Sequence, residues 1–137
     1  DIIPSLGEIL ETFRIRTAAG GRGRPLRRYF DTGSEPSFVK ASVAERLGCA
    51  QELGEPQNFG GLGNGRFVSR EVLYFQIRLL EFWCSHFAFV VADDLLEDRY
   101  DMLIGHTLMQ GFNVGCDMRR RRVILDRGSL RKAFRIY

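Results

Sequence analysis

Two long apolar segments, separated by a single tight turn, constrain the fold of this chain most. Residues Phe67 to Leu80 and Phe82 to Ala92 are rich in aromatic and β-branched side chains, and Glu81 lies between them. Such residues favour extended backbone, and two runs of this kind around a short turn are typical of a β-hairpin. We therefore predict a long hairpin at the centre of a mostly β fold.

Shorter segments on both sides of this hairpin also have the patterns of strands. Apolar and polar residues alternate from Phe13 to Thr17, and a second strand is predicted from Pro25 to Phe30 after a glycine-rich turn. Met102–Ile104 is predicted as a short buried strand. Further expected elements are a helical turn over Thr107–Gln110, a hairpin of Phe112–Met118 with Val123–Leu125, an irregular Glu52–Gln57 and a final strand over Arg131–Tyr137.

Two segments have the spacing of a capping box, in which a serine caps a helix and a glutamate follows three residues later. Ser5–Glu8 predicts a helix over Ser5–Thr12, within an N-terminal extension (residues 1–12) of one domain that spans residues 1–137. Ser42–Glu45 predicts a second helix through Leu47. Gly48 is well placed to end that helix in the left-handed conformation.

Asp31 is the residue with the most specific chemical use, since it opens an Asp-Thr-Gly-Ser motif directly after an apolar strand. A peptide bond can be hydrolysed without a covalent intermediate if one carboxylate takes a proton from water while a second, protonated carboxyl polarises the carbonyl. Two carboxyls that share a site hold one proton between them, because their charges repel. A lone Asp-Thr-Gly also occurs by chance or as a simple turn, so the tripeptide alone leaves both interpretations open.

Three motifs in the same order resemble the retropepsin family, the single-domain aspartic proteases of retroviruses, retrotransposons and some cellular genes. They are Tyr29–Gly48 with the Asp-Thr-Gly motif, the glycine-rich Gly60–Val68, and the hydrophobic-hydrophobic-Gly segment Met102–Met109. The resemblance runs from about Phe13 to Leu125. It implies a mostly β fold, a closed barrel or sandwich with a glycine-rich flap hairpin and short helices.

The resemblance also implies an activity, that of an aspartic endopeptidase which activates water by general acid–base catalysis. Asp31 would be the only catalytic carboxylate of each chain, so the active enzyme would be a homodimer. Thr32, Gly33 and Ser34 would support the dyad, with Thr32 donating across the dimer axis and Gly33 presenting its carbonyl to the substrate. No cofactor and no metal is expected for this chemistry.

The flap and the pocket walls would bind an extended peptide or protein substrate. The flap residues expected to close over this peptide are Gly60, Gly61, Leu62 and Gly63, with Leu62 at the tip. Glycines supply the backbone freedom that such a motion requires. The apolar pocket walls are expected from Leu62, Phe67 and Ile104, with contributions from the Leu26–Phe30 and Phe59 regions, which predicts a hydrophobic preference at the scissile bond.

Glu35 and His106 mark a departure from the retroviral members of the family. In those proteins an acid four positions after the catalytic aspartate pairs with an arginine just after the later glycine, and Glu35 and His106 stand at these positions here. A histidine has an unperturbed pKa near 6.5, so such a pair is fully charged only below about neutral pH. The resemblance therefore implies a structural pair that weakens as His106 loses its proton.

A second interpretation is a non-catalytic module that binds a peptide or protein on the same fold. The basic Arg119–Arg122 hairpin could then contact RNA. The net charge is only +3, and no aromatic stacking set adjoins the four arginines, so a solvated turn is favoured and nucleic-acid binding is not expected. Cys84 and His86 lack the spacing of paired metal ligands and are expected in the core.

The remaining sequence features concern location. No apolar run approaches the roughly 20 residues that a membrane helix needs, so we expect a soluble domain without a membrane span. The three cysteines are far apart, which slightly favours a reducing compartment such as the cytoplasm. The chain begins at Asp1 without a methionine or a signal-peptide pattern, so release from a longer precursor is one expectation.

Overall fold

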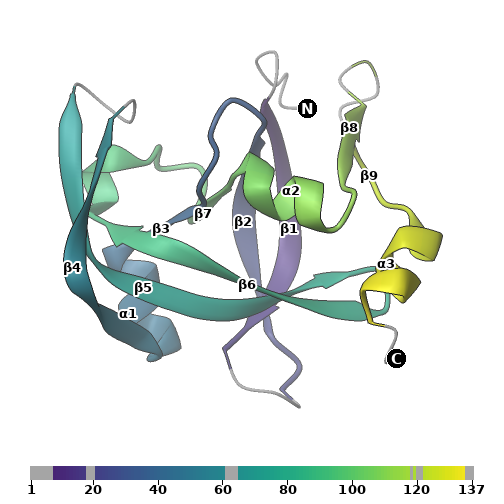
Figure 1. Cartoon of the computed structure of the whole chain (residues 1–137), viewed down its shortest axis with the longest axis horizontal. Helices are drawn as coiled ribbons and strands as arrows, with labels where there is room; N and C mark the ends of the chain where they lie inside the picture. Colours follow the sequence, from purple (N-terminus) through teal and green to yellow (C-terminus); the bar gives the residue numbers. More distant parts are fainter. Residues whose placement is uncertain (1–7, 18–20, 61–64, 118, 120–121, 135–137) are drawn as a thin grey trace.

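The fold is a small β-barrel whose long central hairpin agrees with the prediction. The structure, a computed structural model, describes residues 8–17, 21–60, 65–117, 119 and 122–134. The hairpin consists of β5 (Arg66–Leu79) and β6 (Phe82–Val91), which pair antiparallel along eight residues of each strand, and it crosses the middle of the molecule (Figure 1). Alternation along β5 buries Leu73, Phe75, Ile77 and Leu79, whereas Tyr74 is 53% exposed.

Six strands close the barrel in the order β1–β2–β7–β3–β6–β5, and β1 pairs with β5 to complete the ring. The added strands are β1 (Glu8–Arg16), β2 (Arg24–Asp31), β3 (Phe38–Lys40) and β7 (Met102–Ile104). The ring closes where Ile15 and Arg16 face Ile77 and Gln76. The short predicted strand Met102–Ile104 is confirmed and is fully buried. The mostly β closed barrel predicted from the sequence is therefore present.

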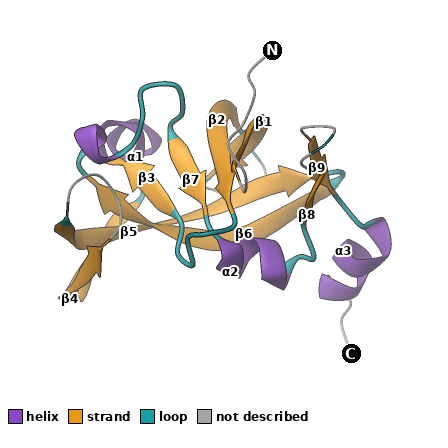
Figure 2. Cartoon of the chain, turned by 90° about the horizontal axis from the view of Figure 1, so that it is seen from above, coloured by secondary structure: helices purple, strands orange, loops and turns teal. Residues whose placement is uncertain are grey.

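Outside this ring, β4 (Ala50–Gly60) pairs with the first half of β5 and extends the sheet to one side (Figure 2). The pairing is continuous from Gln57 to Gly60, but its register shifts between Glu52 and Gln57. Glu52–Gln57, which the sequence predicted as irregular, lies within β4, and the irregularity is this shift of register. Strands accommodate residues that do not match their partner in this way.

Arg28 lies among the buried side chains of the barrel, on β2, and is fully buried. Its Nη1 donates to the carbonyls of Phe13 (3.1 Å) and Leu26 (2.8 Å), and its Nη2 donates to Phe13 (2.7 Å). Burial lowers its pKa to about 9, which still leaves the guanidinium charged at pH 7. Carbonyls of β1 and β2 stabilise the charge by accepting hydrogen bonds from Nη1 and Nη2, whereas Nε has no hydrogen-bond partner among the described residues.

The N-terminal helix predicted over Ser5–Thr12 is wrong for the part that the structure describes. From Glu8 to Ile15, β1 pairs antiparallel with β2, beginning with Glu8 opposite Asp31. The capping-box spacing is a local signal, and the continuous ladder with β2 satisfies the same backbone groups through tertiary pairing. Residues 8–12 therefore belong to the barrel and not to an extension, while residues 5–7 lie outside the described part of the chain.

The final strand predicted over Arg131–Tyr137 is also wrong, because the described part forms the end of α3 (Arg127–Ala133). Asp126 starts this helix by accepting hydrogen bonds at Oδ1 from the N–H groups of Gly128 (2.9 Å) and Ser129 (3.4 Å). The hairpin predicted before it is confirmed as β8 (Gly115–Asp117) with β9 (Arg122–Ile124). Residues 135–137 lie outside the described part of the chain.

Two further helices are short and lie close to the predicted positions, α1 (Ala41–Leu47) and α2 (His106–Gly111). The 3-10 turn η1 (Asp93–Leu95) was not predicted. Gly48 ends α1 with φ 76°, as predicted. Ser42 is not the cap, since its N–H instead donates to Asp93 Oδ1 at 3.0 Å. Among the described residues, no helix is long and apolar enough to cross a membrane.

Asp93→Ala should lower the free energy of unfolding by about 1 kcal/mol at neutral pH, because the N–H of Ser42 loses its acceptor. Hydrogen bonds from Ser42 lower the pKa of Asp93 from 3.8, so this stabilisation is present above that pH and is lost as the pH falls through the lower folded-state pKa. Urea unfolding of both proteins between neutral pH and about pH 2 measures the difference. Asp94→Ala is the control, and an equal loss in both variants would contradict a stabilising role for the hydrogen bond from Ser42 to Asp93.

Candidate active site

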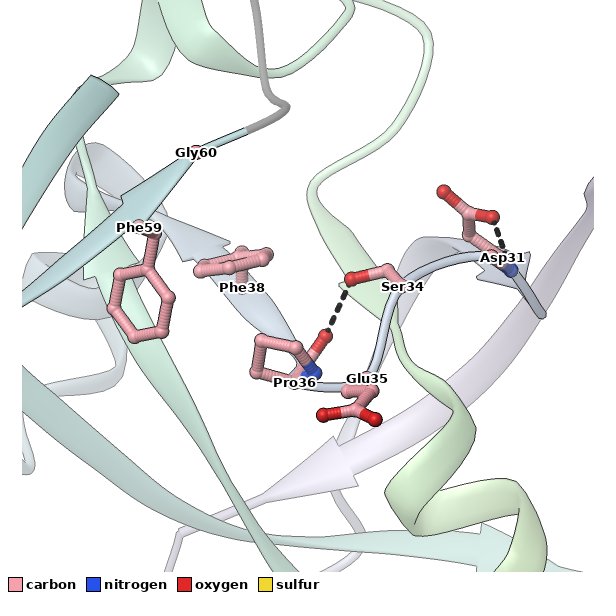
Figure 3. A pocket seen from close by; sticks show the side chains of 8 residues that line it. Asp31, Ser34, Glu35, Pro36, Phe38, Phe59 and Gly60 are labelled. Carbon is pink, nitrogen blue, oxygen red and sulfur yellow. Dashed lines mark hydrogen bonds between the residues drawn. The ribbon is translucent and has the colours of Figure 1, made fainter. Parts of the chain in front are cut away.

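Asp31 is the last residue of β2 and begins a tight loop on the surface of the barrel. Its Oδ1 accepts a hydrogen bond from the N–H of Gly33 at 2.9 Å, and its carbonyl accepts one from the N–H of Ser34 at 3.2 Å. Asp31 and Ser34 are half-buried, whereas Thr32 and Gly33 are exposed. The carboxylate is thus oriented by its own loop (Figure 3), and Asp31 remains partly exposed to solvent.

The segment after β7 forms backbone hydrogen bonds with this loop. Because β2 and β7 run parallel, with Phe30 opposite Ile104, the residues that follow each strand meet at the same edge. The N–H of His106 donates to the carbonyl of Ser34 (2.6 Å), and the N–H of Thr107 donates to the carbonyl of Glu35 (3.0 Å). The first turn of α2 is therefore attached to the Asp31 loop by backbone hydrogen bonds.

Gly105 lies in close contact with the backbone of Glu35 and Pro36 in the Asp31 loop. A Cβ at this position would lie 2.2 Å from the carbonyl oxygen of Pro36 and 2.5 Å from that of Glu35. Its N–H donates to Ser37 Oγ at 3.0 Å, and Ser37 is only 2% exposed. A glycine is required here because two backbone segments touch where a side chain would stand.

A cavity of about 300 Å³ opens beside the Asp31 loop. Its lining combines the loop with an aromatic wall: Asp31, Gly33, Ser34, Glu35, Pro36, Phe38, Phe59 and Gly60. The ring centroids of Phe38 and Phe59 are 5.1 Å apart in an edge-to-face arrangement. The carboxylates of Asp31 and Glu35 point to different sides of the loop (Figure 3). The cavity is therefore lined by two acidic residues, whose carboxylates point apart, beside an apolar surface.

The predicted flap corresponds to the end of the β4–β5 hairpin. Phe59 faces Phe67 and Gly60 faces Arg66 in its last pairs, and Gly60 lines the cavity. The flap residues Gly61, Leu62 and Gly63 lie outside the described residues. Their predicted contact with substrate stays a prediction.

Three other predicted site residues, Ile104, Glu35 and His106, do not make the contacts expected of them. Ile104 is fully buried among core residues, so the expectation that its side chain forms a pocket wall needs correction. The side chains of Glu35 and His106 are exposed and form no ion pair in the part of the chain that is described. Their segments are joined instead by the backbone hydrogen bonds of His106 and Thr107, which do not depend on the charge of His106.

Cys84 and His86 lie on β6, and the prediction that they are core residues is confirmed for Cys84 but not for His86, which lines a surface hollow. Cys84 is fully buried, and burial raises its pKa to about 12, so the thiol is protonated at neutral pH. His86 is half-buried, and desolvation lowers its pKa. Of the four arginines at the β8–β9 turn, Arg119 is exposed, while Arg120 and Arg121 lie outside the described residues.

Comparison with known proteins identifies the family. A family model described as aspartyl protease matches residues 17–108, which is well over half of the chain and includes the Asp31 loop, the flap segment and Gly105. The chain belongs to this family. A comparison of this aspartyl protease family member with curated protein sequences gives no match.

Two solved structures show that this aspartyl protease family member has the retropepsin-like fold predicted from its motifs. The retroviral protease-like domain of Ddi1 from Leishmania major matches with a TM-score of 0.62 at 14% sequence identity, over 90% of this chain and 91% of that domain. The protease of EIAV, solved with the inhibitor HBY-793, matches with a TM-score of 0.53 at 17% identity, over 75% of this chain and 86% of that one.

Sequence reasoning missed several residues that shape this site. Ser37 was not singled out, although its buried hydroxyl accepts the hydrogen bond from Gly105. Pro36 and Phe38 were not expected in the pocket wall, although both line the cavity. The signal for Phe38 was its residue type, since Phe59 and Phe67, with which it packs, flank the predicted flap. The role of Ser37 leaves no signal in the sequence, since it depends on a contact across 68 residues.

Gly105→Ala should lower the free energy of unfolding by about 3 kcal/mol, because the new methyl group would collide with two backbone carbonyls that cannot move independently. Denaturant unfolding of the purified variant measures this loss. Gly54→Ala is the matched control, since a Cβ there meets no atom within 4 Å, and its stability should change by less than about 0.5 kcal/mol. Similar stabilities of the two variants would contradict the close contact.

Proposed function

We propose that this chain is an aspartic endopeptidase that is active as a homodimer, with one Asp31 from each protomer. The observation that carries the proposal is the Asp31 loop itself. Its carboxylate is held at 2.9 Å by the N–H of Gly33, faces a cavity of about 300 Å³, and belongs to a chain of the aspartyl protease family. These features support hydrolysis over a role in peptide binding alone.

The need for a second carboxyl supports the homodimer. General acid–base hydrolysis through water uses two carboxyl groups that share a proton. The chain contains one Asp-Thr-Gly motif, and the other carboxylate in the cavity wall, Glu35, points away from Asp31 (Figure 3). A two-fold dimer supplies the second carboxyl without another motif, because each protomer contributes the same residue.

The reaction then needs no covalent intermediate. The ionised Asp31 takes a proton from water as the water oxygen attacks the scissile carbonyl carbon, while the protonated Asp31 of the partner subunit donates a hydrogen bond to the carbonyl oxygen. A proton subsequently passes to the leaving amine, and the dyad returns to its singly protonated state. The hydrogen bond from Gly33 keeps the carboxylate of Asp31 in one orientation during these steps.

The aromatic wall supports a preference for apolar side chains near the scissile bond. Phe59 lies 4.8 Å from Phe89 and 5.5 Å from Phe67 between ring centroids. A neighbouring hollow of about 320 Å³ shares Glu35, Pro36 and Phe59 with the cavity and adds Phe87 and Phe89 to its lining. An extended peptide would place alternate side chains against these rings and pair its backbone with the edge of the flap.

Asp31→Asn should reduce cleavage of an unfolded polypeptide by at least about 1,000-fold at acid and neutral pH, since the amide can neither accept the proton of water nor share one with its partner. Quantitative mass spectrometry of the peptide products measures the loss. Asp98→Asn, a substitution in an exposed loop, is the matched control and should retain full activity. Equal cleavage by wild type and Asp31→Asn, or none by either, would contradict the proposal.

Mixing wild-type and Asp31→Asn protomers tests whether one Asp31 from each chain is required. If both are needed, activity at constant total protein should fall as the square of the wild-type fraction, because only dimers with two wild-type chains are active. Sedimentation of the same mixtures should give the mass of two chains. A linear fall in activity, or full activity at the mass of one chain, would show that a single protomer suffices.

A further inference from the structure

Four arginines line a second cavity, at the end of β2 opposite to Asp31. The cavity has a volume of about 280 Å³, and its charged lining consists of Arg16, Arg22, Arg24 and Arg46. β2 begins at Arg24 and ends at Asp31, so roughly 23 Å of extended chain separates this cavity from the candidate active site. No carboxylate is among the lining residues that the structure describes.

Two arginines of β1, Arg14 and Arg16, make specific contacts beside this cavity. Arg16 donates from Nε to Gln76 Oε1 (2.7 Å) and from Nη1 to the carbonyl of Gly21 (3.0 Å), and its guanidinium lies 4.0 Å from the ring centroid of Trp83. Arg14 donates to the carbonyls of Arg22 and Gly23, both at 2.9 Å. These bonds attach residues 21–23 to β1.

Gly23 allows the backbone of residues 22–24 to lie close to Ile15 and Trp83. It has φ +75°, and a Cβ at this position would lie 2.8 Å from the Trp83 ring and 2.9 Å from the carbonyl oxygen of Ile15. Only glycine adopts this conformation in this space without strain. The backbone therefore presents Arg22 and Arg24, which flank Gly23, in a defined position beside the end of α1, which contributes Arg46.

Three of the four arginines of this cavity have no acidic partner among the described residues. Arg22, Arg24 and Arg46 are exposed and form no ion pair with any residue described, whereas Arg27, Arg99 and Arg127 each pair with an acid. Residues 18–20, Ala-Ala-Gly in sequence, bring no carboxylate. Four like charges on one small cavity repel one another, in a chain whose net charge is only +3, and an anion would relieve that repulsion.

We infer that this arginine cavity binds a compact, multiply charged phosphate compound, a chain of two or three phosphoryl groups. A guanidinium group donates bidentate hydrogen bonds to phosphate oxygens. A ligand with two or three phosphoryl groups can therefore bind several of these arginines at once, which a single carboxylate cannot. The volume of about 280 Å³ is at the lower limit for small-molecule sites, so the charged chain fits and a large organic body would remain outside.

Titration with tripolyphosphate tests this site, and Trp83, the only tryptophan, reports it because Arg16 stacks on its ring. We expect a saturable change in fluorescence with one ligand per chain. A triple variant with Arg22→Gln, Arg24→Gln and Arg46→Gln should weaken binding at least about 30-fold, through the loss of charged hydrogen bonds. The matched control, with Arg70→Gln, Arg119→Gln and Arg131→Gln, has the same net charge and should change binding by less than about 3-fold.

Two further ligands identify what is recognised. ATP that binds as tightly as tripolyphosphate would show that the phosphate chain suffices, and tighter binding of ATP would show that the base contributes outside the cavity. Binding of a hexaglutamate peptide in place of tripolyphosphate would overturn the proposal, as would equal weakening in both triple variants or the absence of saturation at millimolar tripolyphosphate. Circular dichroism verifies folding, and Arg46→Gln alone, on α1, replaces the triple variant if that protein does not fold.

Discussion

The contact between Gly105 and the backbone of residues 35–36 is the constraint on which the candidate active site depends. Parallel pairing of β2 with β7 brings the ends of both strands to one edge, and the absence of a side chain at Gly105 lets the two following segments touch. The N–H groups of Gly105, His106 and Thr107 then each find an acceptor in the segment that follows Asp31. A loop that would otherwise move freely is thereby attached to the core of the barrel.

The two ends of β2 differ sharply in chemistry, and the barrel between them keeps them apart. Asp31 lies beside a wall of phenylalanine rings, whereas Arg24 lies within a group of guanidinium side chains. Between these ends, Arg28 is buried and donates hydrogen bonds to the carbonyls of Phe13 and Leu26, which links β1 to β2 inside the barrel. One strand thus contributes to the candidate catalytic loop, to the core and to the arginine cavity.

The elements that were predicted correctly are those whose patterns are long or whose local signal agrees with their tertiary surroundings. The β5–β6 hairpin follows from two apolar segments around one turn, and Gly48 ends α1 because its left-handed φ is a local property. The helix predicted over Ser5–Thr12 and the strand predicted over Arg131–Tyr137 were wrong for their described residues, 8–12 and 131–134, because short segments take the conformation that their neighbours impose. For residues 8–12 that neighbour is β2, and for α3 it includes Asp126 and the ring of Phe82.

The sequence by itself determined the mostly β class, the order of the three motifs and the identity of Asp31 as the candidate catalytic residue. Each of these depends on residue type and spacing along the chain, which the sequence contains in full. Only the tertiary structure decided that Ile104 is buried, that Pro36 and Phe38 line the cavity, and that the Glu35 and His106 segments join through their backbones. It also brought Arg46 to the turn that carries Arg22 and Arg24, because contacts between distant segments arise only when the barrel closes.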